Sequence, residues 1–99
     1  MHASISHFPG NPSDLQERYD ALLAEIPTGN IQLHLCLRAP DGLVVVDTCP
    51  SEEAFEAFHH GEAFRALRAR HGLPDPDRVD DFPVHFAAAN GSAVALAAG

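Results

Sequence analysis

The sequence predicts a single α+β domain of 99 residues, in which two helices cover one face of a four-stranded antiparallel sheet. Three observations predict it. Residues 31–38 alternate apolar and polar side chains without a break, which is typical of a strand. Two other segments repeat apolar residues at helical spacing. The resulting element order, β-α-β-β-α-β, is that of the split βαβ arrangement.

The first strand and the first helix are expected within residues 3–26. Residues 3–8 have strand character, and the segment PGNPSD ends the strand. Asn11 suits a helix cap, and Pro12 suits the first helical position because its missing N–H costs nothing there. The segment PTGN at 27–30 is expected to end the helix. Its predicted apolar face consists of Leu15, Tyr19, Leu22, Leu23 and Ile26.

A hairpin is predicted over residues 31–49. Asp41 and Gly42 are its strongest turn signal, because both tolerate the positive φ that a tight turn needs. The strand after the turn is apolar at every position of residues 43–46, so it is apolar on both faces. Two helices cover only one face of the sheet. We therefore expect a second copy of the chain to pack on the other face, unless that face is only partly apolar and tolerates water.

The register of the hairpin decides which polar groups meet. An even loop length places His34, Cys36, Asp47 and Cys49 on one face. A two-residue turn sets His34 opposite Cys49, and a four-residue loop sets His34 opposite Asp47. A three-residue loop would place His34 beside Thr48.

The second helix is expected to begin after Ser51, a good cap, and the HHG segment at 59–61 is expected to kink or interrupt it. The predicted last strand lies within residues 79–87, with one side formed by Phe82, Val84 and Phe86. The domain is thus expected to span residues 1–87, and the tail at 88–99 to be loose. The apolar stripe of the second helix consists of Phe55, Phe58, Phe64 and Leu67.

The composition limits the possible partners. A formal net charge of −8 argues against binding to nucleic acid or to anionic membranes, which require clustered Arg or Lys. No signal peptide or membrane span is visible, so we expect a cytoplasmic protein. In that compartment Cys36 and Cys49 are expected to be free thiols.

Residues 40–67, PDGLVVVDTCPSEEAFEAFHHGEAFRAL, resemble the antibiotic biosynthesis monooxygenase-like proteins of the dimeric α+β barrel superfamily. The shared parts are a strand that leads into a small-residue cap, then SEEAFxxF, a short break and ExFR. The element order extends the resemblance over residues 3–87. It implies a ferredoxin-like fold, a homodimer, and a ligand cavity between sheet and helices in each subunit. Members include cofactor-free oxygenases of aromatic polyketides, heme-degrading enzymes and lactone isomerases.

The resemblance departs from the heme-degrading branch of that superfamily. The branch carries a Trp before the second helix, a His ligand along that helix and an Asn on the first strand. This chain has Cys49 and Arg68 at the first two positions and no Asn in its first strand. His71 lies three residues beyond the expected ligand, nearly one turn further along. We therefore expect no heme, and we expect no other cofactor.

The polar face of the hairpin carries the predicted catalytic groups. An imidazole beside a carboxylate makes an acid or base that works near neutral pH, so His34 is predicted as the base and Asp47 as the group that orients it. The resulting hypothesis is a small cofactor-independent oxygenase, cyclase or isomerase that acts on an aromatic or polyketide-like molecule. The residues predicted to contact this small apolar or aromatic molecule are Tyr19, Cys36, Cys49, Phe55, Phe58 and His59.

Other interpretations of these residues stay open. The alternative interpretation of His34 is a solvated histidine on an edge strand. In that case the chain is a non-catalytic homodimeric module that binds a small molecule or another protein. His34, Cys36 and Cys49 also offer soft metal ligands, which His7 or His85 would complete. Because H-x-C on one strand is not a recognised zinc pattern, no metal is expected.

Overall fold

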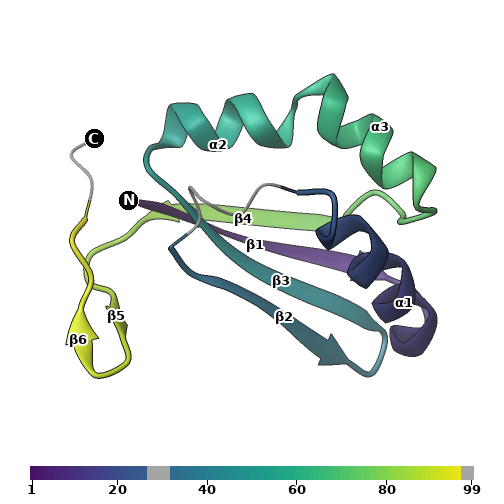
Figure 1. The fold of residues 1–99 in the computed structure, drawn as a ribbon, viewed down its shortest axis with the longest axis horizontal. Coiled ribbons are helices and arrows are strands. Elements are labelled where there is room, and N and C mark those ends of the chain that lie inside the picture. Colours follow the sequence, from purple (N-terminus) through teal and green to yellow (C-terminus); the bar gives the residue numbers. More distant parts are fainter. Residues whose placement is uncertain (27–31, 97–99) are drawn as a thin grey trace.

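The computed structural model describes residues 1–26 and 32–96. The predicted β-α-β-β-α-β order is confirmed, with the second helix divided in two and a small hairpin added after the last strand (Figure 1). The elements are β1 (His2–Pro9), α1 (Pro12–Leu23), β2 (His34–Ala39), β3 (Gly42–Cys49), α2 (Glu52–His59), α3 (Glu62–Arg70), β4 (Arg78–Pro83), β5 (Ala88–Ala89) and β6 (Ser92–Ala93). The expected helix end at 27–30 lies outside the described residues.

The main sheet has the strand order β2-β3-β1-β4, and all its neighbouring strands are antiparallel. The three helices lie on one side of this sheet (Figure 1). This order and this layering are those of the ferredoxin-like α+β fold, as predicted. None of the helices in the described part of the chain is long and apolar enough to cross a membrane.

The helices begin where the sequence analysis expected. The Asn11 side chain accepts hydrogen bonds from the backbone N–H groups of the first turn of α1, and Ser51 accepts one from Ala54 at the start of α2. The predicted interruption at HHG is confirmed, because α2 ends at His59 and α3 begins after Gly61. A side chain at Gly61 would place its Cβ 2.8 Å from the Ala57 carbonyl oxygen, so the break requires glycine.

The turn between β2 and β3 is centred one residue earlier than predicted. Ala39 pairs with Gly42, so Pro40 and Asp41 are the central residues. Pro at the second position and Gly at the fourth position are typical of a type I turn, which needs no positive φ at its centre. Gly42 is required for another reason: a Cβ there would lie 2.0 Å from the Phe8 carbonyl oxygen on the neighbouring strand.

The packed core lies under α1. It is a cluster of Phe8 from β1, Leu15 and Tyr19 from α1, and Leu43 from β3. Partly buried residues that pack against this cluster are Leu23, Cys36, Val45 and Leu73. The sheet surface beneath α2 and α3 is less completely filled, which leaves room for a cavity.

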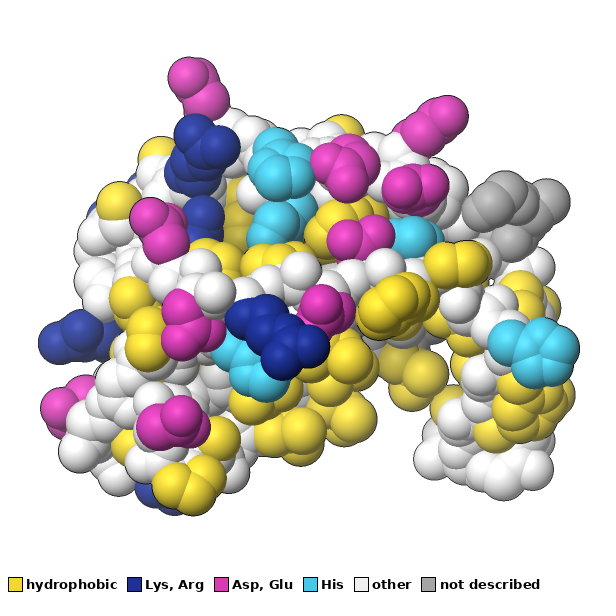
Figure 2. All heavy atoms as spheres, turned by 180° about the vertical axis from the view of Figure 1, so that it is seen from behind, with side chains coloured by type: hydrophobic (Ala, Val, Ile, Leu, Met, Phe, Trp, Pro, Cys, Tyr) yellow, Lys and Arg dark blue, Asp and Glu magenta, His cyan; other side chains and the backbone are white. Residues whose placement is uncertain are grey.

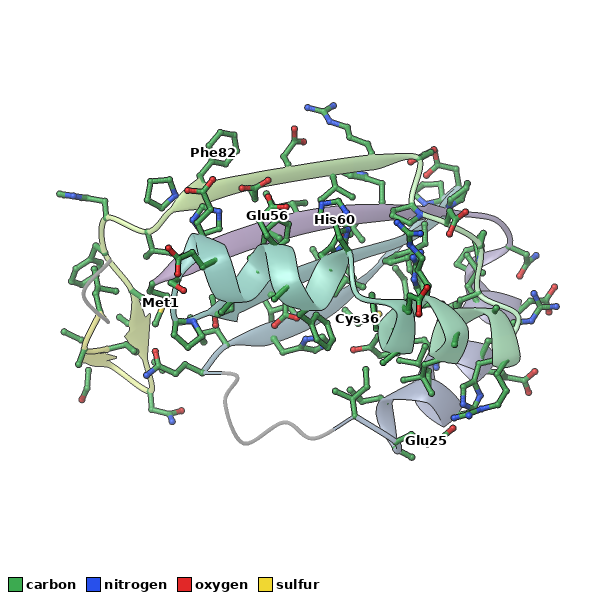
Figure 3. The ribbon with its side chains drawn as sticks, turned by 90° about the horizontal axis from the view of Figure 1, so that it is seen from above. Met1, Glu25, Cys36, Glu56, His60 and Phe82 are labelled. Atoms are coloured by element: carbon green, nitrogen blue, oxygen red, sulfur yellow. The ribbon has the colours of Figure 1, made fainter. Side chains whose placement is uncertain are left out.

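The last strand is shorter than predicted and does not place its phenylalanines in the core. β4 ends at Pro83, so Val84 and Phe86 lie beyond it. Phe82 is 62% exposed because it faces away from the helices, and it stands off β4 at the edge of the sheet (Figure 3). The prediction that Phe82, Val84 and Phe86 form one side of the last strand is therefore wrong.

Residues 84–96 form an arm that the sequence analysis did not predict. β5 and β6 pair in it around Asn90 and Gly91, whose φ angles are 54° and 78°. Asn-Gly is the residue pair that a tight hairpin turn of this type favours. The arm extends past the end of the sheet on the side away from α2 and α3 (Figure 1).

The sheet face without helices is apolar and exposed. Leu35 is 54% exposed and Leu37 is 47% exposed, and both point away from the helices. Half-buried Val44 and Val46 lie opposite them on β3. Figure 2 shows hydrophobic side chains gathered on this underside of the body, facing the space between the body and the arm. We call this surface, together with Phe82, the open face.

Candidate active site

A cavity of about 350 Å³ lies between the sheet and the helices. Its volume is at the lower end of the range of roughly 300–1,000 Å³ that is typical of small-molecule sites. β1 and β3 form its floor, α1 one side, and α2 and α3 its roof. Most of the lining is apolar, with a few polar groups among aromatic and aliphatic side chains.

Small side chains on β1 explain why this part of the fold is hollow. Ser4 and Ser6 are buried and occupy alternate positions on the helix-covered side of the strand. A serine fills much less space than the leucine or valine that usually occupies such a position. The sequence analysis overlooked both residues, although two inward-facing serines on one predicted strand are the signal that could have identified the floor of a cavity.

The observed register places the two predicted catalytic residues side by side. His34 on β2 is directly opposite Asp47 on β3. This is the pairing predicted for the four-residue loop, although Ala39 and Gly42 also pair, so only Pro40 and Asp41 lie between the strands. His34 Nδ1 lies 3.3 Å from Asp47 Oδ1. The distance fits an ion pair, but the angle does not fit a hydrogen bond, and Nδ1 has no hydrogen-bond partner within the described residues. The backbone N–H of Thr48 donates to the same carboxylate oxygen at 2.9 Å and holds it in place.

Tyr19 contacts the other nitrogen of the imidazole. Its hydroxyl hydrogen-bonds to His34 Nε2, and the two rings are stacked with an interplanar angle of 12°. A carboxylate beside Nδ1 favours the tautomer that carries its proton there. We therefore assign the Tyr19 O–H as the donor and His34 Nε2 as the acceptor.

The environment of Tyr19 keeps its hydroxyl protonated. Burial is the largest cause that raises the pKa of Tyr19 to about 12, followed by the negative charges of Cys36, Asp47 and Asp20. At neutral pH the phenol is thus a hydrogen-bond donor and not a base. Tyr19, His34 and Asp47 form a continuous polar chain in the cavity wall, which we call the Tyr19–His34–Asp47 chain.

Aromatic side chains from the helices form the roof. Phe55 is buried and stacks on His59 with ring centroids 5.1 Å apart. Phe58 also lines the cavity, although it is half exposed, and it contacts Phe64 at 4.6 Å. Burial lowers the pKa of His59, with smaller contributions from the charges of His60 and Arg68, so its imidazole is neutral at neutral pH.

The two cysteines occupy different places. Cys49 lines the cavity, whereas Cys36 is not part of its wall and packs against the core cluster. Both are free thiols, as predicted. Burial is the main cause that raises the pKa of each thiol, so neither is a thiolate at neutral pH.

The metal-ligand set considered above is not assembled. His7 points to the open face, and His85 is exposed in the arm. Within residues 1–26 and 32–96, the group of three potential metal ligands whose atoms all lie within 4.8 Å of one another consists of carboxylates, which are exposed or half exposed outside the cavity. They are Glu52, Glu56 and Asp81. Exposed acidic groups cluster often without an ion, and we assign no site to them.

Arg68 and Thr48 are the remaining polar residues of the wall that were not among the predicted site residues, and Arg68 is the charged one. Arg68 is buried, and it reaches the cavity from α3. An arginine near the end of a helix is usually solvated, and the one sign of its position was the resemblance, which aligned Arg68 with the ligand position of the heme-degrading branch.

No protein-family profile matches the sequence, and no curated protein matches it either. Among solved structures, the chain is similar to the crystal structure of a "putative Antibiotic biosynthesis monooxygenase" from Chloroflexus aurantiacus J-10-fl, with a TM-score of 0.57 and 12% sequence identity. The similarity covers 82% of this chain and 89% of that one. At this identity the likeness concerns the fold and not the reaction, so the chain has the ferredoxin-like α+β fold of that protein.

Proposed function

We propose that the chain is a cofactor-independent enzyme that removes a proton from an enolisable aromatic or polyketide-like molecule held in the cavity. The observation that carries the proposal is the Tyr19–His34–Asp47 chain in the wall of an otherwise apolar cavity. An imidazole is the side chain whose pKa best suits proton transfer near neutral pH. The aromatic roof provides flat apolar surfaces for a ring system.

The proton reaches His34 through Tyr19, because the Tyr19 hydroxyl occupies Nε2. The substrate C–H or O–H bond breaks and its proton joins the Tyr19 oxygen. The former Tyr19 proton joins His34 Nε2 in the same step. The substrate is left as an enolate or phenolate, and His34 becomes an imidazolium beside the Asp47 carboxylate, which stabilises the new positive charge.

The fate of the anion defines the reaction class. Attack of the anion on O₂, which the solution supplies, would make the protein an oxygenase and an oxidoreductase. Addition to a second group of the same molecule would make it a cyclase, and return of the proton to another atom would make it an isomerase. All three start with the same proton abstraction, so this step is the one to test.

Deuterium exchange measures that step without turnover. We expect the protein to accelerate exchange of the α-protons of 2-tetralone, a two-ring enolisable ketone, in D₂O, as followed by ¹H NMR. His34→Ala should reduce the protein-dependent rate about a hundredfold, the usual effect of a positioned base. His60→Ala is the matched control, because that imidazole is exposed and lies outside the cavity. An exchange rate that His34→Ala leaves unchanged would refute the proposal.

The alternative is the non-catalytic binding module, and the same experiment separates the two. A module would bind 2-tetralone in a titration followed by ¹⁵N–¹H spectra and would leave its exchange rate at the buffer value. Tyr19→Phe tests the proton path in addition. A relay through the hydroxyl predicts a rate loss comparable to that of His34→Ala, whereas direct abstraction by Nε2 predicts a rate equal to or above the wild type.

We propose further that a second copy of the chain covers the open face. A monomer would expose the leucines of β2 and Phe82 as one apolar surface, which isolated proteins rarely do. The arm favours a second copy over an unrelated partner. It extends past the same side of the sheet and carries the exposed side chains of Phe86 and Leu96, so in a two-fold pair each arm can contact the other subunit.

A further inference from the structure

Arg68 is a buried cation in the cavity wall with unused hydrogen-bond donors. The residue is 6% exposed, and its side chain reaches the cavity from the last turn of α3. Its Nε and Nη1 atoms have no hydrogen-bond partner in the described part of the chain. Buried guanidinium donors are normally satisfied, because leaving a charged group unpaired is costly.

Asp75 does not satisfy this cation. Its carboxylate oxygen lies 3.1 Å from Arg68 Nη1, but the geometry is not that of a hydrogen bond, and Nε remains unpaired. The Asp75 side chain is 92% exposed. Water screens the Asp75 side of this ion pair, so the pair compensates the buried charge only in part.

Apart from Asp75, the neighbouring groups of the roof hold the guanidinium in place without adding a negative charge. Phe64, one helical turn earlier, supports it with its ring centroid 5.1 Å from Arg68 Cζ. His59 in the same roof is neutral at neutral pH, since burial lowers its pKa. Arg68 therefore offers a fixed, desolvated positive charge at the α3 end of a cavity whose other walls are mostly apolar.

We infer that the ligand of this cavity is an aromatic carboxylate whose carboxylate group binds Arg68. A single planar carboxylate matches the fork of one guanidinium, whereas a doubly charged phosphate would need more donors than this wall provides. The inference rests on the proposed function for the other end of the ligand, where the acidic C–H or O–H group faces Tyr19. The positive charge selects the ligand, and the Tyr19–His34–Asp47 chain acts on it.

A pair of isosteric probes tests the charge. We expect 2-naphthoate to bind about tenfold or more tightly than 2-naphthamide, its neutral analogue, in calorimetric or NMR titrations of the wild type. Arg68→Gln should remove this preference and leave the affinity for 2-naphthamide nearly unchanged. Arg65→Gln, an exposed arginine outside the cavity wall, is the matched control and should keep the preference.

A measurement on the wild type keeps the test decisive if Arg68→Gln does not fold. The Nε–H resonance of Arg68 should shift on addition of 2-naphthoate and not on addition of 2-naphthamide. Asp75→Asn should retain or modestly increase the affinity for 2-naphthoate, because it removes a competing anion. Equal affinities of the two probes, binding of neither probe, or a preference that survives Arg68→Gln would each overturn the inference.

Failure of the carboxylate inference can be distinguished from failure of the proposed function. Binding needs no proton transfer, so His34→Ala should keep the preference for 2-naphthoate even though it slows exchange of 2-tetralone about a hundredfold. Loss of exchange activity with an intact carboxylate preference would support both statements. An intact preference in a protein that exchanges no protons would support the anion site and refute the base.

Discussion

The two faces of the sheet differ in polarity. On β2 and on part of β1, the difference is the reverse of that in an ordinary two-layer protein. On β2 the helix-covered side carries His34 and Cys36, and the open face carries Leu35 and Leu37. On β1 the covered side carries Ser4 and Ser6. At these positions polar or small residues lie inside and large apolar residues lie outside, which is the reverse of the usual arrangement, whereas the covered side under α1 is packed with Phe8 and Leu43.

Because the two faces differ in this way, we expect them to have different roles. A covered face that is not filled with large apolar side chains leaves a cavity and places polar groups in it. An exposed face that is filled with them is rarely left uncovered. If both proposals hold, the same strand provides the site on one side and the interface on the other, and substitutions at adjacent residues should affect different properties.

The largest effect is expected on the open face. Leu35→Lys would place a charge in the proposed interface and should weaken dimerisation at least about a hundredfold, which corresponds to roughly 3 kcal/mol. Sedimentation velocity at micromolar concentration would measure it. Ala66→Lys, on the exposed surface of α3, is the control and should leave the association state unchanged. A wild-type protein that sediments as a monomer would refute the assignment of this face.

A larger side chain on the covered face should affect ligand binding and not dimerisation. Ser6→Leu would extend into the cavity and should lower the affinity for 2-tetralone about tenfold, while the free energy of unfolding changes by about 1 kcal/mol. Ile5→Leu changes the neighbouring residue, which points to the open face, and should not alter ligand binding. NMR titration and urea unfolding would measure the two quantities. Unchanged ligand affinity in Ser6→Leu would contradict the location of the site.

A pH titration of Tyr19 should report the burial of this residue on the covered face. Tyr19 is the only tyrosine and the chain has no tryptophan, so absorbance near 295 nm follows this one phenol. The folded protein should titrate near pH 12, and the urea-unfolded chain near 10. Because the pKa is raised on folding, the contribution to stability is full below pH 10 and is lost as pH rises toward 12. A folded protein that titrates near 10 would contradict the burial of Tyr19 beside His34.

The smallest expected effect is a difference in reactivity between the two cysteines of the covered face. Burial raises the pKa of both thiols, so iodoacetamide should modify them more slowly than free cysteine at neutral pH. Saturating 2-naphthoate should slow the modification of Cys49, which lines the cavity, and leave that of Cys36 unchanged. Peptide mass spectrometry would assign each site. Equal protection of both cysteines would indicate a general tightening of the protein.

Local signals in the sequence were sufficient to predict most of the fold. Caps at Asn11 and Ser51, the break before Gly61 and the alternation around His34 each depend on chemistry within a few residues. The pairing of His34 with Asp47 was one of the registers that the hairpin allowed. Its selection depended on the approach of Gly42 to the Phe8 backbone of another strand, a contact that a local pattern does not contain.

The remaining features depend on contacts between distant segments. Phe82 was expected to share one side of the last strand with Val84 and Phe86 because residues 82–86 are apolar at alternate positions, but β4 ends at Pro83 and Phe82 faces away from the helices. Arg68 was not among the predicted site residues, and its burial follows from how α3 packs over the sheet. Asn90 and Gly91 were a local signal that the sequence analysis passed over, since the residues around them are small and lack periodicity.

Tyr19 belongs both to the packed cluster under α1 and to the Tyr19–His34–Asp47 chain. Its ring fixes the helix to the sheet, and its hydroxyl fixes the imidazole. Selection for a more stable variant and selection for a different chemistry would therefore compete for the same residue. A chain under both pressures would have to change Arg68 first, because this residue lies on α3 and is not part of the cluster that attaches α1.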